Sequence, residues 1–97
     1  MDIRAVSSRQ ADLAARDDMT VTPEQCRAAR ALLDWSQSAL AEATGSGQST
    51  IAKFERGVRN PHASTLKTIR TTLEAAGVEF IDENGGGPGV RLRQRRR

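Results

Sequence analysis

The sequence predicts a mostly α-helical bundle of four to five short helices that ends in a β-hairpin. Three observations support this fold class. Apolar residues recur three or four positions apart in four segments, which glycines and prolines separate. A short turn, from Gly45 to Gly47, joins two of these segments so that one helix can leave the other at a steep angle. Near the C-terminus the pattern changes to alternation around a glycine-rich loop. The predicted helices cover residues 23–33, 37–44, 48–56 and 63–76.

The composition indicates one domain with a small core. The chain has 97 residues, of which 37% are hydrophobic and only three are aromatic. Leu, Ile, Val and Ala must therefore form most of the core, and association with a second copy would help to stabilise it. With a single cysteine, Cys26, and a single histidine, His62, the chain has neither a Cys and His set for zinc nor an intrachain disulfide. We expect no catalytic residues, no metal and no cofactor.

The first predicted helix has a strong start signal. Thr22 can cap it, Pro23 suits its first position, and Gln25 can complete a capping box. Cys26 lies on the apolar stripe of this helix, so we expect a buried structural thiol. The expected inward face consists of Cys26, Ala29, Leu32 and Leu33, and the expected outward face includes Arg27 and Arg30.

The segment 48–56 has the features of a helix that reads DNA bases. Its outward face carries short, amide-bearing or cationic side chains, and no acid precedes Glu55. A glutamine can pair with the edge of adenine, and a serine or threonine can reach a base edge or a thymine methyl group. The expected base-reading residues are Gln48, Ser49, Thr50 and Lys53.

Positive charge begins where this helix begins. The chain has a net charge of +3, but residues 1–19 and 20–46 each sum to −1, whereas residues 47–76 carry five Lys or Arg against two Glu. Clustered cations attract a polyanion, and their coincidence with the turn favours DNA over an ordinary solvated face. In the loop that follows the helix, Arg56, Arg59 and Asn60 are expected to bind backbone phosphates.

The residues around the turn resemble the Cro/cI type of helix-turn-helix regulator, also called the XRE family. The resemblance covers roughly residues 23–76 and implies a lambda-repressor-like fold with double-stranded DNA as the partner. It also implies that Gln37 binds a phosphate and that Glu55 is structural, with Arg56 and Arg59 as candidate partners. The matching runs are Trp35 to Ala41, Gly45, Gln48 to Ile51, Phe54 to Gly57, and Arg59 to Pro61.

Two positions depart from the family pattern. Ser46 stands where the family has an apolar residue that plugs the turn, and Gly47 stands where Ser or Thr caps the second helix. Glycine is a tolerated N-cap. The motif is therefore expected to form with a looser turn.

The C-terminal segment predicts a hairpin and a route to a dimer. Residues 78–81 and 90–93 alternate in part around a loop at 82–89. A lone hairpin is marginal in water, so we expect it to pack on a helix or to pair with strands of a second subunit. The family resemblance also implies a homodimer, with the last helix as the alternative interface. The expected divisions are a loosely ordered or short helical extension at 1–19, a DNA-binding domain at 20–77, the hairpin at 78–93 and a basic tail at 94–97.

These features predict a sequence-specific DNA-binding regulator of transcription, a repressor that acts as a dimer on a near-palindromic operator. The alternative is an antitoxin or partner-binding protein that uses the same helix-turn-helix to regulate its own operon. An enzyme is the weakest hypothesis, because nothing serves as nucleophile or base. No apolar run approaches the length of a membrane span and the first residues lack a signal-peptide core, so we expect a cytoplasmic protein without a membrane partner.

Overall fold

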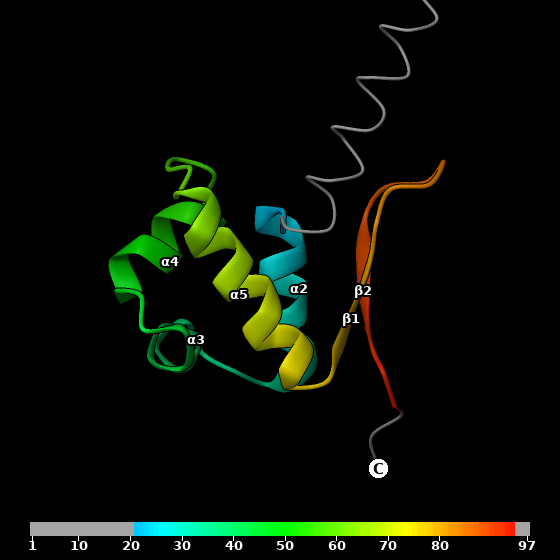
Figure 1. The fold of residues 1–97 in the computed structure, drawn as a ribbon, viewed down its shortest axis with the longest axis horizontal. Coiled ribbons are helices and arrows are strands. Elements are labelled where there is room, and N and C mark those ends of the chain that lie inside the picture. The colour runs from blue at the N-terminus through cyan, green and yellow to red at the C-terminus, as the bar shows by residue number, and fades with distance from the viewer. Residues whose placement is uncertain (1–20, 95–97) are drawn as a thin grey trace, which may run out of the picture.

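Four helices and a two-stranded antiparallel sheet make up residues 21–94, the part of the chain that this computed structural model describes (Figure 1). The predicted helices are present, and two of the predictions, 48–56 and 63–76, each extend one residue beyond the observed helix. The predictions for residues 1–19 and 95–97 lie outside the described residues. The elements are α2 (Pro23–Leu33), α3 (Gln37–Thr44), α4 (Gln48–Glu55), α5 (Ala63–Ala75), β1 (Val78–Ile81) and β2 (Gly89–Leu92).

The capping box at the start of α2 is confirmed in both halves. The Thr22 hydroxyl accepts a hydrogen bond from the Gln25 backbone N–H, and the Gln25 side-chain oxygen accepts one from the Thr22 N–H, both at 3.0 Å. The Gln25 amide nitrogen also donates to the carbonyls of Ile81 and Gly89, at 3.4 and 3.0 Å. One buried side chain therefore caps α2 and joins it to the loop end of the hairpin, where Ile81 pairs with Gly89.

The turn between α3 and α4 depends on local backbone geometry. Gly45 ends α3 with a φ of 74°, in the left-handed region that glycine adopts without strain. The Ser46 N–H donates to the Ala41 carbonyl and to the Thr44 hydroxyl, which anchors the turn to α3. Gly47 is the N-cap of α4 and supplies no side-chain hydrogen bond. Backbone groups and Thr44 thus hold a turn that has neither an apolar plug nor a capping side chain.

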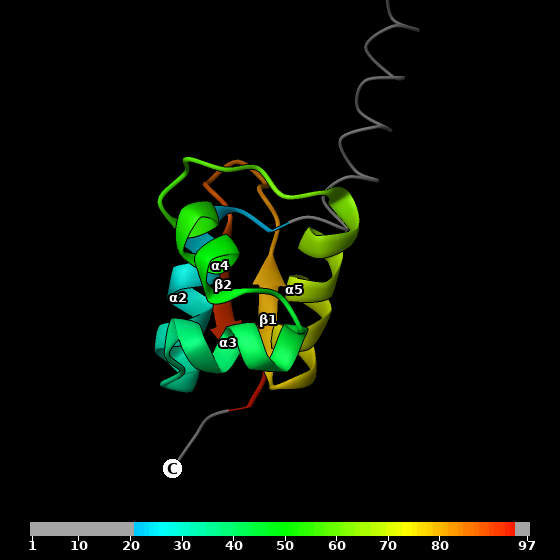
Figure 2. The same cartoon turned by 90° about the vertical axis from the view of Figure 1, so that its left-hand side faces the viewer.

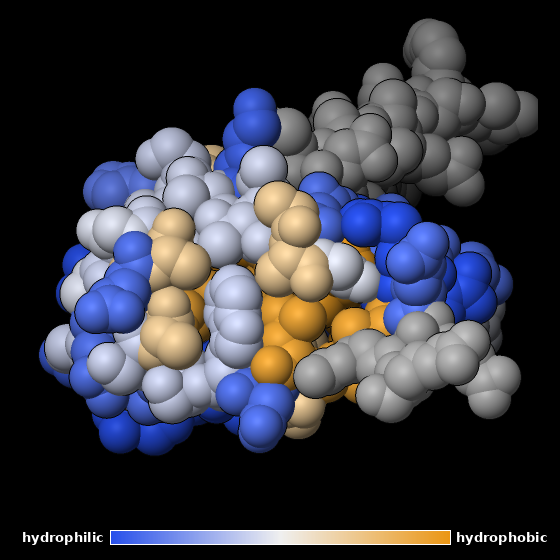
Figure 3. All heavy atoms as spheres, turned by 90° about the horizontal axis from the view of Figure 1, so that it is seen from below, coloured by the Kyte–Doolittle hydropathy of each residue, from blue (hydrophilic) through white to orange (hydrophobic). Residues whose placement is uncertain are grey.

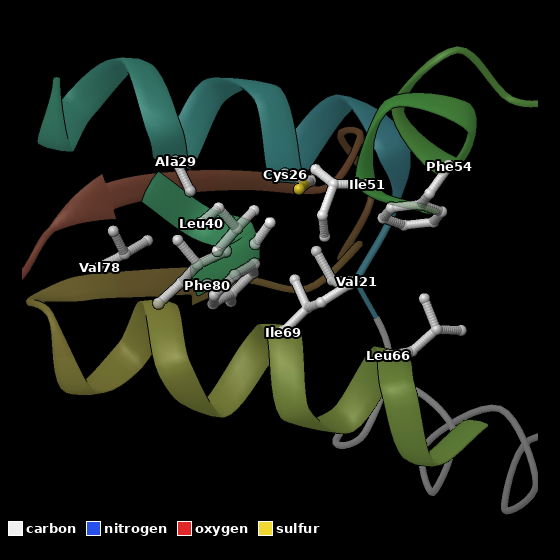
Figure 4. Close-up of a cluster of buried hydrophobic side chains, with 12 residues drawn as sticks. Val21, Cys26, Ala29, Leu40, Ile51, Phe54, Leu66, Ile69, Val78 and Phe80 are labelled. Carbon is white, nitrogen blue, oxygen red and sulfur yellow. The ribbon is translucent and has the colours of Figure 1, made fainter. Parts of the chain in front are cut away.

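The core lies where the four helices meet the sheet. Side chains from α2, α4, α5 and β1 converge around Leu40 of α3, as Figure 4 shows. Leu40, Ile51, Ile69, Leu73 and Val78 are fully buried. Trp35, between α2 and α3, is half-buried and packs against this cluster. Apolar atoms also reach the surface on the face seen from below, where α2 and α5 end (Figure 3).

The hairpin packs on α2 and α5, as expected of a sheet too small to stand alone. Val78 pairs with Leu92 and Phe80 with Val90, so these four side chains share the face of the sheet that meets the helices. The outer face carries the Glu79–Arg91 ion pair at 3.1 Å. On the inner face the Arg70 guanidinium lies 4.8 Å from the centre of the Phe80 ring and joins α5 to β1.

Among residues 21–94, no helix is long and apolar enough to cross a membrane. The same part of the chain contains no group of three or more His, Cys, Asp or Glu side chains placed to hold a metal ion.

Candidate nucleic-acid interface

The outward face of α4 presents three of the four expected base-reading side chains to solvent. Gln48, Ser49 and Lys53 are exposed, and Thr50 is half-exposed. Ile51 and Phe54 are buried on the opposite face, which holds the helix against the core. The helical period of 3.6 residues separates these two faces. Figure 2 shows α3 and α4 together in front of the sheet, with the first turn of α4 near the viewer.

The length of α4 suits a DNA major groove. Eight residues at a rise of about 1.5 Å per residue give a helix about 12 Å long, and the major groove of B-DNA is about 12 Å wide. When the first turn of such a helix meets base edges, its last turn lies near the sugar-phosphate backbone. This length agrees with the expectation that the residues beyond Glu55 bind phosphates rather than bases.

The loop after α4 presents the remaining expected phosphate ligands. Arg56, Arg59 and Asn60 are all exposed, and Gly57 turns the chain with a φ of 77°. Pro61, which is buried, anchors the far end of the loop. The loop thus holds two cations and one amide at the end of α4 and leaves all three side chains accessible.

Glu55 is structural, as the family resemblance implied, but the expected partners were wrong. Its carboxylate binds Arg30 of α2 instead of Arg56 or Arg59, with Arg30 Nε and Nη2 each donating at 2.7 Å. The Cys26 thiol and the Gln37 amide nitrogen also donate to this carboxylate, each at 3.1 Å. Glu55 therefore joins α2, α3 and α4 at one buried point.

The expected faces of α2 need a matching correction. Arg30 does not face solvent: its side chain is only 18% exposed, because it reaches inward to Glu55 and also donates to the Trp35 carbonyl. Leu32, which was expected inside, is half-exposed. Arg30 follows Cys26 by four residues, so the two share a helix face. That spacing is the sequence signal for an inward Arg30, and a buried arginine requires a partner such as Glu55.

Charge and burial shift the pKa values in this cluster. Burial acts to raise the pKa of the Glu55 carboxyl, but hydrogen bonds from Arg30, Cys26 and Gln37 together hold it below its ordinary value. The hydrogen bond to Glu55 raises the pKa of Arg30. Burial, followed by the hydrogen bond to Glu55, raises the pKa of the Cys26 thiol far above its ordinary value. The cluster is therefore a carboxylate, a guanidinium and a neutral thiol at neutral pH.

The structure brings only part of the expected phosphate set together. Gln37, the first residue of α3, and Arg56 line one groove, whereas Arg59 and Asn60 lie further along the exposed loop. Gln37 is half-buried and its amide is oriented by Glu55. Arg27, which had no assigned role, lines the same groove and donates from Nη1 to the Glu55 backbone carbonyl.

Comparison with known proteins adds one finding to this geometry. The sequence model of a family described as helix-turn-helix matches residues 27–76, from the second turn of α2 to the end of α5. No curated protein matches the chain. The matched segment is about half of the chain. It contains Glu55 and two of the residues that bind its carboxylate, Arg30 and Gln37, but not Cys26.

Proposed function

The chain belongs to the Cro/cI (XRE) type of helix-turn-helix regulators, which bind DNA, and we propose that it is a cytoplasmic repressor that reads a near-palindromic operator as a homodimer. The exposed polar face of α4 is the observation that carries this proposal. A repressor needs only to occupy its operator and exclude other proteins. Binding of DNA by the expected contact residues is enough for that action, and no second binding surface is needed.

Base readout is assigned to the first turns of α4. Gln48 and Ser49 are exposed at its start, where the helix of such a motif approaches the base edges, and Thr50 and Lys53 flank them. A glutamine donates and accepts at once, which matches the adjacent donor and acceptor of adenine in the major groove. The lysine adds a cation that suits guanine O6 and N7.

Phosphate binding is assigned to Gln37, Arg56, Arg59 and Asn60. Gln37 keeps a second amide hydrogen beyond the one it donates to Glu55, and the three loop residues have exposed side chains. Such contacts set the position of the protein on the duplex without reading its sequence.

Dimerisation is assigned to the outer edge of β2. The Arg93 N–H donates to the Gly77 carbonyl at 2.7 Å, so Arg93 and Gly77 form a hydrogen-bonded pair. Hydrogen-bonded and non-hydrogen-bonded pairs alternate along an antiparallel ladder. Val90 and Leu92 therefore belong to non-hydrogen-bonded pairs, and their N–H groups point away from β1. Both residues are half-exposed, whereas Val78 on the outer edge of β1 is fully buried. The β2 edge is therefore the accessible one.

The position of the sheet supports this interface. In Figure 1 the hairpin lies on the far side of α2 and α5 from α4. Antiparallel pairing of β2 with its copy places a twofold axis perpendicular to the sheet. That axis keeps both α4 helices on the same side of the dimer, as binding to two half-sites about 34 Å apart requires.

Selection of bound sequences from random duplexes tests the function. We expect a near-palindromic winner that outcompetes random DNA at two salt concentrations. Binding that weakens with salt but enriches no sequence would contradict it.

Sedimentation of Val90→Pro tests the interface, because proline removes the N–H that points out of β2 and leaves the bonds to β1 intact. We expect a monomer. A dimeric variant would place the interface elsewhere, with α5 the next candidate. Removing the whole hairpin is a poorer test, since Val78 and Phe80 belong to the core.

A further inference from the structure

A groove of about 600 Å³ lies between the start of α2, the start of α3 and the end of α4. Three arginines line it: Arg30 pairs with Glu55 and Arg56 is assigned to phosphate binding, but Arg27 has no role among those assigned above. In Figure 2, α2 lies beside α4, so the groove adjoins the side of the molecule that presents the base-reading helix. Its charged and amide-bearing side chains are Glu24, Arg27, Arg30, Gln37, Glu55 and Arg56.

The charge of the groove is positive. Arg30 and Glu55 neutralise each other through their ion pair. Arg27 and Arg56 remain as two cations against the single carboxylate of Glu24, and none of these three side chains has an ion pair within residues 21–94. An anion in the groove therefore meets a net attraction.

Arg27 is held in place but keeps donors free. Its Nη1 donates to the Glu55 carbonyl at the end of α4, which fixes the guanidinium beside the groove. A guanidinium has five N–H donors in a planar fork, and within the described part of the chain Arg27 makes this one hydrogen bond. The remaining donors suit bidentate recognition of a phosphate.

We propose that the groove binds one phosphate of the DNA backbone and that Arg27 donates to it. The inference rests on the proposed function and adds a phosphate contact from α2 to those assigned to α3 and to the loop. The length of α4 supports it, because the groove adjoins the end of the helix, which lies near the backbone when the first turn meets the bases. Gln37 and Arg56 flank the same phosphate.

The test compares Arg27→Gln, Arg27→Lys and a matched control, Arg93→Gln. Arg93 is also an exposed arginine that donates to a helix carbonyl, that of Glu74, but it lies in the hairpin segment away from α4. Affinity for the selected operator and for a random duplex is measured by fluorescence anisotropy at 50 and 200 mM salt. The unfolding midpoint of each variant is measured in parallel.

Arg27→Gln should weaken binding to both duplexes alike. It should also reduce the slope of log affinity against log salt concentration by about 1. Between the two salt concentrations the wild type should then lose about 3.5-fold more affinity than this variant. Arg27→Lys should keep the wild-type slope because it keeps the charge, and Arg93→Gln should keep it as well. A fall in the unfolding midpoint without a change in slope would assign Arg27 to stability alone and overturn the inference.

Two further outcomes separate this inference from its neighbours. One outcome is a salt slope for Arg27→Gln equal to that of the wild type, together with a reduced salt slope for Arg56→Gln. This outcome would refute the phosphate contact in the groove but would agree with the proposed function. A wild type that prefers no duplex would instead contradict the proposed function. Inorganic phosphate titrated without DNA should shift the NMR signals around Arg27 only weakly. If these shifts instead saturated at millimolar phosphate, and Arg27→Gln bound DNA normally, the groove would be a site for a free anion and the inference would be wrong.

Discussion

Arg30 and Glu55 join α2 to the end of α4 through two parallel hydrogen bonds of 2.7 Å. The carboxylate is only 2% exposed, so the pair fixes α4 against α2 in a site that water hardly reaches. The fork of the guanidinium matches both carboxylate oxygens, which restricts the angle as well as the distance. The orientation of the exposed polar face of α4, to which base reading is assigned, therefore depends on a residue outside α3 and α4.

Removing Arg30 should destabilise the protein strongly. Arg30→Met leaves the buried Glu55 carboxylate without its cation, a change that costs about 3 kcal/mol of unfolding free energy or more. Urea denaturation measures it. The double variant Arg30→Met/Glu55→Gln should recover part of the loss because no unpaired charge remains. If the double variant were no more stable than the single one, loss of packing rather than of charge would be the cause.

The stability of the protein should depend on pH through Glu55. Its pKa is lower in the folded chain than its ordinary value of 4.5, so folding favours the charged form. The stabilisation is complete above about pH 4.5 and disappears as the pH falls through the lower folded pKa. Denaturation curves of the wild type and of Glu55→Gln should therefore converge as the pH falls below this value. A stability difference that stayed constant down to pH 2 would contradict the assignment.

Gln25 should contribute to stability through two separate sets of bonds. Gln25→Ala removes the capping box and both hydrogen bonds to the hairpin, and we expect a loss of about 2 kcal/mol. Gln25→Glu keeps an acceptor for the Thr22 N–H but has no donor for the carbonyls of Ile81 and Gly89. Hydrogen exchange should then show opening at the hairpin with α2 still protected. Equal loss of protection in both elements would show that the two sets of bonds are not separable.

Base-reading and phosphate-binding residues should respond differently to alanine. Gln48→Ala or Ser49→Ala should cost about 1 to 3 kcal/mol on the operator and relax the preference at one base pair. Arg56→Ala or Arg59→Ala should weaken binding to all sequences alike and make the affinity less dependent on salt. Competition binding with operator and random duplexes distinguishes the two patterns. Equal losses on both duplexes for all four variants would refute the assignment of base readers.

Cys26 should not react in the folded protein. The side chain is fully buried and burial raises the pKa of the thiol, so almost no thiolate forms at neutral pH. Alkylation by iodoacetamide should therefore proceed at the rate at which the protein opens, and urea should accelerate it. Rapid modification without urea would show that the contact with Glu55 opens readily.

Most of the secondary structure followed from local signals in the sequence. Thr22, Pro23 and Gln25 define the start of α2 through bonds within one turn, and Gly45 ends α3 because its φ is open to glycine. The spacing of Leu40, Ile51 and Leu66 marked the buried faces correctly. These features depend on residues close in the chain. The outward face of α4, with Gln48, Ser49 and Lys53, follows from the same periodicity.

Tertiary structure alone decided which polar groups from distant parts of the chain meet. Glu55 has arginines one and four residues after it, yet it binds Arg30, 25 residues earlier, because α2 and α4 pack together and place that guanidinium against the buried carboxylate. Gln25 bridges to Gly89, 64 residues away, for the same kind of reason. Pairings between distant residues depend on how whole elements pack, and no local pattern encodes that. The sequence by itself therefore determined the elements and the exposed polar face of α4, whereas the fold decided the cluster that orients this face and the groove beside it.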